Sequence, residues 1–305
     1  MKKWMKWTAW IASLLIIVVF GYAIYLYQSV KSTADQIYEP RNPVKPVSVT
    51  DAKGGLQVEL NRKEPFNALI LGVDERQNDR GRSDTMIVLS VNPGKKKVLM
   101  FNIPRDTRTE IVGRNTEDKI NHAYAFGGVD MSLATVEQFL GIPIHYYMKV
   151  DMEGFSKIID LVGGVDVNNP FAFDYEGKRY EQGNIHLDGV AALGFSRMRY
   201  DDPKGDLGRN DRQREVLKQM LKNTMQFSSV LHLQNMLDEL GTHVRTDLTF
   251  DEMKELLLDY RSDLEEIDTV EIKGKGEKIN GIYYFIVGQE EKERIHGLLT
   301  QHLEQ

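Results

Sequence analysis

An uncharged segment of 21 residues, from Trp7 to Tyr27, constrains this chain more than any other part of its sequence. A helix of that length, at about 1.5 Å per residue, crosses a hydrocarbon core about 30 Å thick. Three lysines precede the segment, and the first positive charge after it is Lys31. Because positive charge stays on the cytoplasmic side, the pattern predicts a cytoplasmic tail at 1–6, a transmembrane anchor at 7–27 and an extracellular position for everything that follows.

The sequence therefore predicts a single-pass, type II protein of the cell membrane. A cleaved signal peptide is the alternative, but the apolar run is long for one and no A-x-A cleavage signal follows it. Residues 28–65 are predicted to form an extracellular linker, because Pro40, Pro43 and Pro46 favour extended backbone and two glycines follow them. The folded domain is then predicted to cover 66–305.

Composition and missing motifs exclude several classes of function. The chain has 305 residues and a formal net charge of -6, which argues against a nucleic-acid partner. It has no cysteine, which removes disulfides, thiolate nucleophiles and cysteine-based zinc sites. It also lacks a GxxxxGK[ST] phosphate loop, an HExxH zinc motif and the second glycine of a hydrolase nucleophile elbow. The sequence thus marks neither a covalent nucleophile nor a nucleotide-binding loop.

Apolar runs of strand length alternate with amphipathic segments along the predicted domain. Strands are predicted at 66–73, 85–91, 97–103, 144–151, 165–168, 269–274 and 281–287, and helices at 131–140, 152–162, 187–197, 211–225, 231–240, 250–260 and 290–303. Such alternation favours an α/β fold with a central mixed sheet and helices on both sides.

The stretch 197–214 contains five arginines and four aspartates in 18 residues. Guanidinium groups stay charged and offer forked donors that match two phosphate oxygens, so their convergence indicates a phosphate or pyrophosphate site. The run after Asn210 has helical spacing, and Asn210 or Asp211 is expected to cap that helix. The residues expected around its anion-binding N-terminus are Arg209, Arg212 and Gln213. We expect Arg214 to face solvent; the alternative for the whole stretch is a solvated loop whose arginines pair with nearby aspartates.

Charged residues also follow the ends of the first predicted strands; these are Asp74, Arg82, Asp84, Arg105 and Asp106. Loops at strand ends are a common place for a site in an α/β sheet. The carboxylates of Asp74 and Asp84 are hard oxygen ligands suited to Mg²⁺, with Mn²⁺ as a second candidate, since Mg²⁺ leaves its other positions to water and phosphate. The alternative is that Asp84 caps a turn and Asp74 ends a strand. His122 is either a general base or, as is more common, structural.

Six blocks of sequence carry a resemblance to a known family. In chain order they are LGVD, RSDTM, IPRDT, DKINHAYAFGG, GFxxxIDxxGGVDV, and SRMRYDD with GDLGRNDRQR. They resemble the signature blocks of the LytR-CpsA-Psr family of Gram-positive envelope proteins. The resemblance extends from Phe66 to Gln219, and the predicted anchor fits the family's topology.

The resemblance implies a phosphotransferase that moves a glycopolymer from an undecaprenyl-pyrophosphate carrier onto peptidoglycan, in this branch wall teichoic acid onto a muramic acid C6 hydroxyl. It also implies an apolar tunnel for the prenyl chain. Asp74 and Asp84 would hold the metal, and Asp106 would position an arginine or help to activate the incoming hydroxyl. The residues implied to grip the phosphates are Arg82, Arg105, Arg197, Arg199, Arg209, Arg212 and Gln213; the catalytic set is Arg105, Asp106, Arg197, Arg199 and Arg209.

Membrane topology and chemistry agree with this implication. Outside the cell there is no ATP, so a transferase needs a donor that is already activated, and phosphoryl transfer needs positioned positive charge more than a covalent nucleophile. Two other functions stay open. A hydrolase would release the head group to water with the same phosphate grip. A non-catalytic membrane regulator would act on transcription only indirectly, because a six-residue tail is too short for a DNA-binding module.

Overall fold

The computed structural model describes residues 2–42, 58–75, 81–226, 241–260 and 266–304, and its centre is a six-stranded sheet with the order β11-β6-β1-β2-β3-β12. The strands are β1 (Phe66–Val73), β2 (Ser83–Asn92), β3 (Lys97–Asn102), β6 (Tyr146–Asp151), β11 (Val244–Thr246) and β12 (Glu266–Thr269). Strand β1 pairs antiparallel with β2 and parallel with β6, and β12 pairs parallel with β3. The sheet is therefore mixed, as the sequence predicts.

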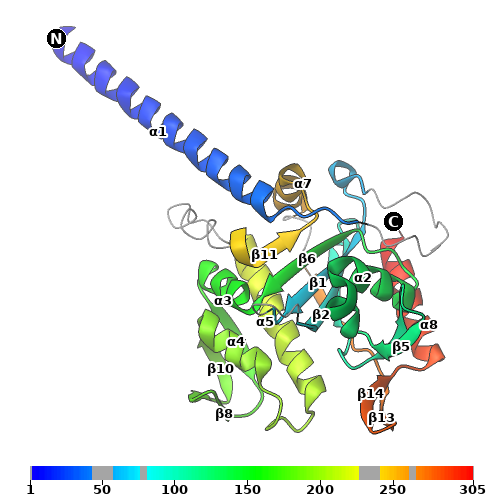
Figure 1. The fold of residues 1–305 in the computed structure, drawn as a ribbon. Helices are drawn as coiled ribbons and strands as arrows, with labels where there is room; N and C mark the ends of the chain where they lie inside the picture. Colours follow the sequence, from blue (N-terminus) through cyan, green and yellow to red (C-terminus); the bar gives the residue numbers. More distant parts are fainter. Residues whose placement is uncertain (1, 43–57, 76–80, 227–240, 261–265, 305) are drawn as a thin grey trace.

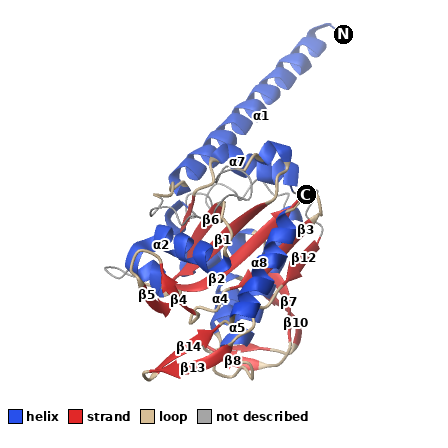
Figure 2. Cartoon of the chain, turned by 90° about the vertical axis from the view of Figure 1, so that its right-hand side faces the viewer, coloured by secondary structure: helices blue, strands red, loops and turns tan. Residues whose placement is uncertain are grey.

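The two faces of the sheet carry separate parts of the core. Along β2, Met86 and Val88 belong to one apolar cluster and Ile87 and Leu89 to the other, because successive strand side chains point to opposite faces. Helices α2 (His122–Leu140) and α8 (Gln289–Leu303) pack into the first cluster, and α5 (Asp206–Gln226) packs into the second. Helices thus lie on both sides of the sheet (Figure 2), which confirms the predicted α/β class.

A smaller layer packs against α5 on the side away from the sheet (Figure 1). It consists of α3 (Met152–Leu161), α4 (Gly189–Arg197), and the strand pairs β7 (Val165–Asn169) with β10 (Gly183–Leu187) and β8 (Phe173–Tyr175) with β9 (Lys178–Tyr180). Stacked rings fill its core, with the centroids of Phe173 and Tyr180 4.7 Å apart. On α5, Val216 joins this layer while the adjacent Leu217 joins the sheet, so α5 connects the two.

Several elements differ from the sequence prediction. The pairs β4 (Arg108–Ile111) with β5 (Thr116–Lys119) and β13 (Lys275–Ile279) with β14 (Ile282–Ile286) are tight hairpins, of which only the last strand was predicted. The strand predicted at 269–274 is wrong, since β12 ends at Thr269. Helix α2 starts nine residues earlier than predicted and kinks at Gly128, whose φ is 67°. Helix α7 (Phe250–Glu255) continues as a π-helix (Leu256–Tyr260), and the helix predicted at 231–240 lies outside the described residues.

Helix α1 (Lys2–Ile37) is continuous and projects away from the domain (Figure 1). Apolar side chains on it are exposed, among them Trp10 at 78%, Val18 at 62% and Phe20 at 67%. Within the described part of the chain, no helix is both long enough and apolar enough to cross a membrane. The anchor predicted at 7–27 stays a prediction.

The predicted linker at 28–65 is wrong at both of its ends. Helix α1 continues to Ile37, and the residues after it dock on the domain: Glu39 N donates to the carbonyl of Thr246 at 2.8 Å, and Arg41 Nε lies 2.5 Å from Asp247 Oδ2. Leu60, in the 3₁₀ turn η1 (Leu60–Arg62), is 2% exposed and belongs to the core. Prolines and glycines favour irregular backbone, but they do not prevent the flanking residues from packing.

Candidate active site

The arginine-rich stretch folds as a turn followed by the first turns of α5. The helix begins at Asp206, so the prediction that Asn210 or Asp211 caps it is wrong. Two features of the preceding turn accompany this earlier start of α5. Gly205 has a φ of 57°, which favours glycine, and the carboxylate of Asp202 lies against the first turn of the helix. A Cβ on Gly208 would meet Asp202 Oδ2 at 2.0 Å, so that close approach requires a glycine. Arg209 therefore lies within the first turn of the helix.

Arg212 is buried and holds this connection together. Its Nε donates to the carbonyl of Phe195 at 2.9 Å, one terminal nitrogen pairs with Asp202, and the other donates to the carbonyl of Met198. The Arg212 and Asp202 side chains are each 4% exposed. All three guanidinium nitrogens of Arg212 thus have partners within the chain. In the structure this arginine therefore links α5 to the end of α4.

The next two residues of α5, Gln213 and Arg214, also form hydrogen bonds within the protein. Gln213 Oε1 accepts from Asn102 Nδ2 at 3.1 Å. The expectation that Arg214 faces solvent is wrong: it is 8% exposed, pairs with Asp211 and lies 3.4 Å from Asn102 Oδ1. Asn102 ends β3, so packing of the helix on the sheet decides where this face points.

Arg105 and Arg209 lie at the centre of a charged cluster that also includes Asp84, Asp206 and Arg199. Arg105 Nη1 contacts Asp84 Oδ1 at 2.7 Å, and Arg209 Nη2 lies 2.8 Å from Asp206 Oδ1. Burial lowers the pKa of Arg209; the positive charges of Arg105 and Arg199 lower it further, while Asp206 and Asp84 oppose the shift. The cluster thus places three guanidinium groups within electrostatic range of one another.

Donors in this cluster lack hydrogen-bond partners. Arg105 Nε and both Nε and Nη2 of Arg209 are buried without a hydrogen bond in the described structure. The 2.8 Å contact between Arg209 Nη2 and Asp206 Oδ1 is close enough for an ion pair, but its direction does not make a hydrogen bond. A buried unsatisfied polar group costs about 1–3 kcal/mol, and more when charged. Two adjacent guanidinium groups with unmatched donors form a binding place for an anion with several oxygens, such as a phosphate.

Asp106 lies on the other side of Arg105 in the same loop. Lys119 Nζ contacts Asp106 Oδ1 at 2.7 Å, and Arg105 Nε lies 3.9 Å from Asp106 Oδ2. The backbone around them is fixed, because Thr107 N donates to the carbonyl of Pro104 at 2.9 Å and Asn121 N donates to the carbonyl of Arg105 at 3.3 Å. A carboxylate is therefore held near the unmatched Nε of Arg105.

The two predicted metal ligands lie at neighbouring strand ends. Asp74 follows β1 and its backbone N donates to the carbonyl of Arg82 at 3.3 Å, while Asp84 belongs to β2. Gly81 permits this approach, since a Cβ there would lie 2.0 Å from the carbonyl oxygen of Asp74. Within the described residues no group of three or more His, Asp or Glu side chains could hold a metal. Two aspartates at neighbouring strand ends, one of which contacts Arg105, still fit Mg²⁺, which takes its remaining ligands from water and phosphate.

Other candidate residues lie at the edge of this cluster or apart from it. Arg82 is exposed, and Arg199 lies over the ring of Tyr200, 4.6 Å from its centroid. Arg197 faces the β8–β9 hairpin, with its Nη1 3.6 Å from Glu176 Oε1.

His122 is set apart from the arginines. It contacts Asp118 at 2.7 Å and lies against Phe126, and Asp118 is on the opposite face of β5 from Lys119. These contacts favour the structural role for His122.

Sequence reasoning missed four residues around the cluster: Asp206, Lys119, Tyr200 and Tyr283. Asp206 and Tyr200 lie inside the arginine-rich stretch, so the density of charge that marks this stretch could have pointed to them. Lys119 and Tyr283 come from the β4–β5 and β13–β14 hairpins, which the sequence pattern did not connect with the site.

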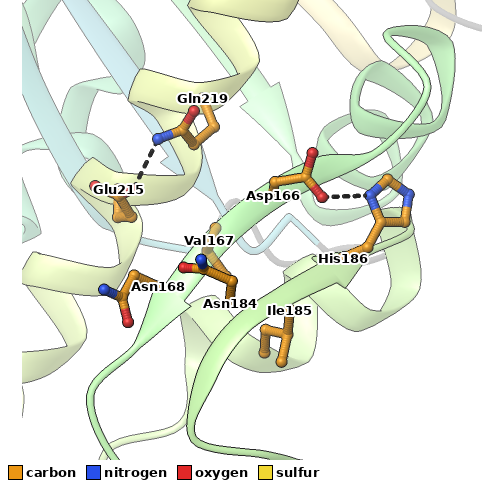
Figure 3. A pocket seen from close by; sticks show the side chains of 8 residues that line it. All are labelled: Asp166, Val167, Asn168, Asn184, Ile185, His186, Glu215 and Gln219. Atoms are coloured by element: carbon orange, nitrogen blue, oxygen red, sulfur yellow. Dashed lines mark hydrogen bonds and ion pairs between the residues drawn. The ribbon is translucent and has the colours of Figure 1, made fainter.

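A separate pocket of about 540 Å³ lies between β7, β10 and α5 (Figure 3). Its lining residues are Asp166, Val167, Asn168, Asn184, Ile185, His186, Glu215 and Gln219. Gln219 donates to Glu215 at 2.8 Å and His186 pairs with Asp166 at 2.9 Å. The lining carries two carboxylates and no lysine or arginine, so this hollow is a poor place for a phosphate, and the arginine cluster remains the candidate site.

Comparisons with known proteins agree with this geometry. Residues 24–301 match the LytR_cpsA_psr family. A relative from Halalkalibacterium halodurans, named polyisoprenyl-teichoic acid--peptidoglycan teichoic acid transferase TagU, is 46% identical over 306 residues, covering 100% of this chain and 99% of its own. The crystal structure of Bacillus subtilis TagU aligns with a TM-score of 0.65 and 42% identity, covering 80% of this chain and 98% of that one. A structure of TagT bound to LI-WTA aligns with a TM-score of 0.70 and 27% identity, covering 83% and 94% of the two chains.

Proposed function

Because the chain belongs to the LytR-CpsA-Psr family, we propose that it transfers wall teichoic acid from an undecaprenyl-pyrophosphate carrier to peptidoglycan, forming a phosphodiester at the muramic acid C6 hydroxyl. The name of the Halalkalibacterium halodurans relative, which this chain matches along its whole length, supports a teichoic acid transferase. The same name includes a polyisoprenyl-teichoic acid, which supports a lipid-linked donor.

One observation carries the proposal: the half-buried Arg105 lies within electrostatic range of the buried Arg209, and both have buried nitrogens that no described group of the protein satisfies. A pyrophosphate supplies the oxygens that these donors lack, and its negative charge relieves the mutual repulsion of the guanidinium groups.

The reaction follows from this arrangement. The acceptor oxygen forms a bond to the phosphorus that carries the polymer, and the bond from that phosphorus to the bridging oxygen breaks, which releases undecaprenyl phosphate. The acceptor proton passes to a carboxylate beside the arginines, and we assign this role to Asp106, which lies 3.9 Å from Arg105 and pairs with Lys119. Arg105 and Arg209 stabilise the charge on the phosphoryl oxygens in the transition state. When bound at Asp74 and Asp84, Mg²⁺ supplies further positive charge to the phosphates.

The anchor at 7–27 is part of the proposal. It rests on the 21 uncharged residues, on the lysines that precede them, and on the exposed apolar side chains along the projecting helix α1. In this arrangement the domain is extracellular and faces the plane in which a lipid-linked donor lies. The prenyl tunnel that the family resemblance implies also stays a prediction.

The experiment is a transfer assay with the full chain in detergent or lipid. The donor is a lipid-pyrophosphate-linked polymer, and the acceptor is a peptidoglycan oligomer. Wild-type protein is expected to form the phosphodiester, and Arg209→Lys to lose turnover, because lysine keeps the charge but not the forked donors. Arg179→Lys is the matched control, since Arg179 is 55% exposed and pairs with the exposed Asp174.

Each outcome has a distinct meaning. Release of undecaprenyl phosphate without a new phosphodiester would establish the hydrolase instead. If folded wild-type protein neither transfers nor hydrolyses the donor, the regulatory alternative remains. Wild-type turnover in Arg209→Lys would remove this arginine from the site.

A further inference from the structure

The β13–β14 hairpin is docked on the loop that carries Arg105 and Asp106. The backbone N of Phe285 donates to the carbonyl of Asp106 at 2.8 Å, and Thr107 forms a parallel bridge with Phe285. These contacts join residues about 180 positions apart in sequence. The hairpin is therefore fixed to the catalytic loop by its backbone and forms one wall beside it.

The side chains of Tyr283 and Tyr284, consecutive residues of β14, lie on opposite faces of the hairpin. Tyr284 is 8% exposed and lies under two cations, with Arg108 5.9 Å and Lys119 6.0 Å from its ring centroid. It thus fixes the hairpin to the β4–β5 pair. Tyr283 points to the other face, as strand alternation requires, and is 45% exposed.

The ring of Tyr283 is held in a defined place. A Cβ on Gly276 would lie 2.8 Å from both Cε2 and the hydroxyl oxygen of Tyr283, so the ring lies across this glycine. Burial raises the pKa of the Tyr283 phenol, and the negative charges of Asp106 and Asp206 raise it further. The phenol is therefore protonated at neutral pH, because its ordinary pKa is about 10 and both effects raise it.

We propose that Tyr283 positions the acceptor saccharide, with its exposed ring against a sugar face and its hydroxyl near the hydroxyl that attacks the phosphorus. This inference rests on the proposed transfer reaction and names a residue that recognises its acceptor. Because the phenol stays protonated, it acts as a hydrogen-bond donor and an apolar surface, not as the base.

The docking of the hairpin assigns Tyr283 to the acceptor instead of the donor. The donor brings two phosphates, which belong with Arg105, Arg199 and Arg209. The strand that carries Tyr283 is bound through Phe285 to Asp106, the carboxylate proposed to take the acceptor proton. An attacking oxygen must reach the phosphorus in line with the leaving oxygen, and so it enters from the side that carries a base.

The test uses the full chain with a lipid-pyrophosphate-linked donor and measures two products, the polymer transferred to peptidoglycan oligomers and the donor hydrolysed by water. Tyr283→Ala is expected to raise the KM for the oligomer about tenfold or more, since it removes one hydrogen bond and one packed ring. Hydrolysis without acceptor should stay near the wild-type rate. Tyr283→Phe keeps the ring, folds as the wild type does, and should lose only the hydrogen-bond part of the effect.

Ile282→Ala is the matched control, because Ile282 is 51% exposed and precedes Tyr283 on the same strand. It is expected to leave both products unchanged. An unchanged acceptor KM in both tyrosine variants would overturn the inference, and so would an equal fall of transfer and hydrolysis, which indicates a structural role. Failure of the wild type to transfer at all would instead refute the proposed function.

Discussion

Replacing Arg212 by methionine separates a structural arginine from one that binds phosphate. The family resemblance implies that Arg212 grips the donor, whereas in the structure it donates to Phe195, Met198 and Asp202 and is 4% exposed. Methionine fills similar space without charge. Its introduction leaves the Asp202 carboxylate, also 4% exposed, without its counter-ion.

The expected loss of stability is large. Removing one partner of a buried ion pair costs about 3–5 kcal/mol. In a domain of this size each 1 kcal/mol lowers the Tm by about 2–4 °C, so a fall of about 6–20 °C is expected. Arg179→Met, which breaks an exposed ion pair, should change the Tm little, because water already screens that pair. The double variant Asp202→Leu with Arg212→Met should recover part of the loss, because no unpaired charge remains.

The assay combines thermal unfolding followed by circular dichroism with transfer activity measured well below the lowest Tm. Activity of Arg212→Met should be mostly retained at that temperature. An unchanged Tm together with lost turnover would refute the structural role and return Arg212 to the phosphate site. Full additivity of the two single changes would show that Asp202 and Arg212 are not coupled.

Three further predictions follow from the geometry. Arg105→Lys should reduce turnover by about a hundredfold or more while changing the Tm little, as measured beside Arg294→Lys, at an arginine of α8 whose side chain is 38% exposed and pairs with Glu291. Asp84→Asn should raise the Mg²⁺ concentration needed for half-maximal transfer, whereas Asp166→Asn, at an 80% exposed carboxylate, should not. Burial lowers the pKa of His145 from 6.5 to about 4, so the unfolded chain binds a proton first and stability falls as the pH drops from about 6.5 towards 4. His145→Gln should flatten that part of the stability curve measured by urea unfolding, and His186→Gln, 61% exposed, should leave it unchanged.

The sequence predicted the elements whose local pattern agrees with their final environment. The apolar runs of β1, β2 and β3 are buried strands, and Arg105 and Asp84 do meet at their ends. Short hairpins were missed because strands of three to five residues, such as β13, carry too little periodicity to be distinguished from loops. The start of α5 was misplaced because a contact within the preceding turn, Asp202 against Gly208, contributes to it, and helical spacing of apolar residues does not reveal such a contact.

The five arginines of the stretch 197–214 show where local reasoning ends. Sequence shows that they are charged and close together, but a guanidinium group binds a ligand only where the fold leaves its donors unmatched. Met198, Phe195 and Asp202 satisfy Arg212, and Asp211 satisfies Arg214, whereas Arg209 is buried with two nitrogens that have no hydrogen bond. Arg105, 104 residues before Arg209 and within electrostatic range of it, is half-buried and keeps one unmatched nitrogen among the described residues. The candidate site is thus defined by which donors remain after folding, and that set depends on carbonyl and carboxylate oxygens supplied by α4, the turn before α5 and the end of β3.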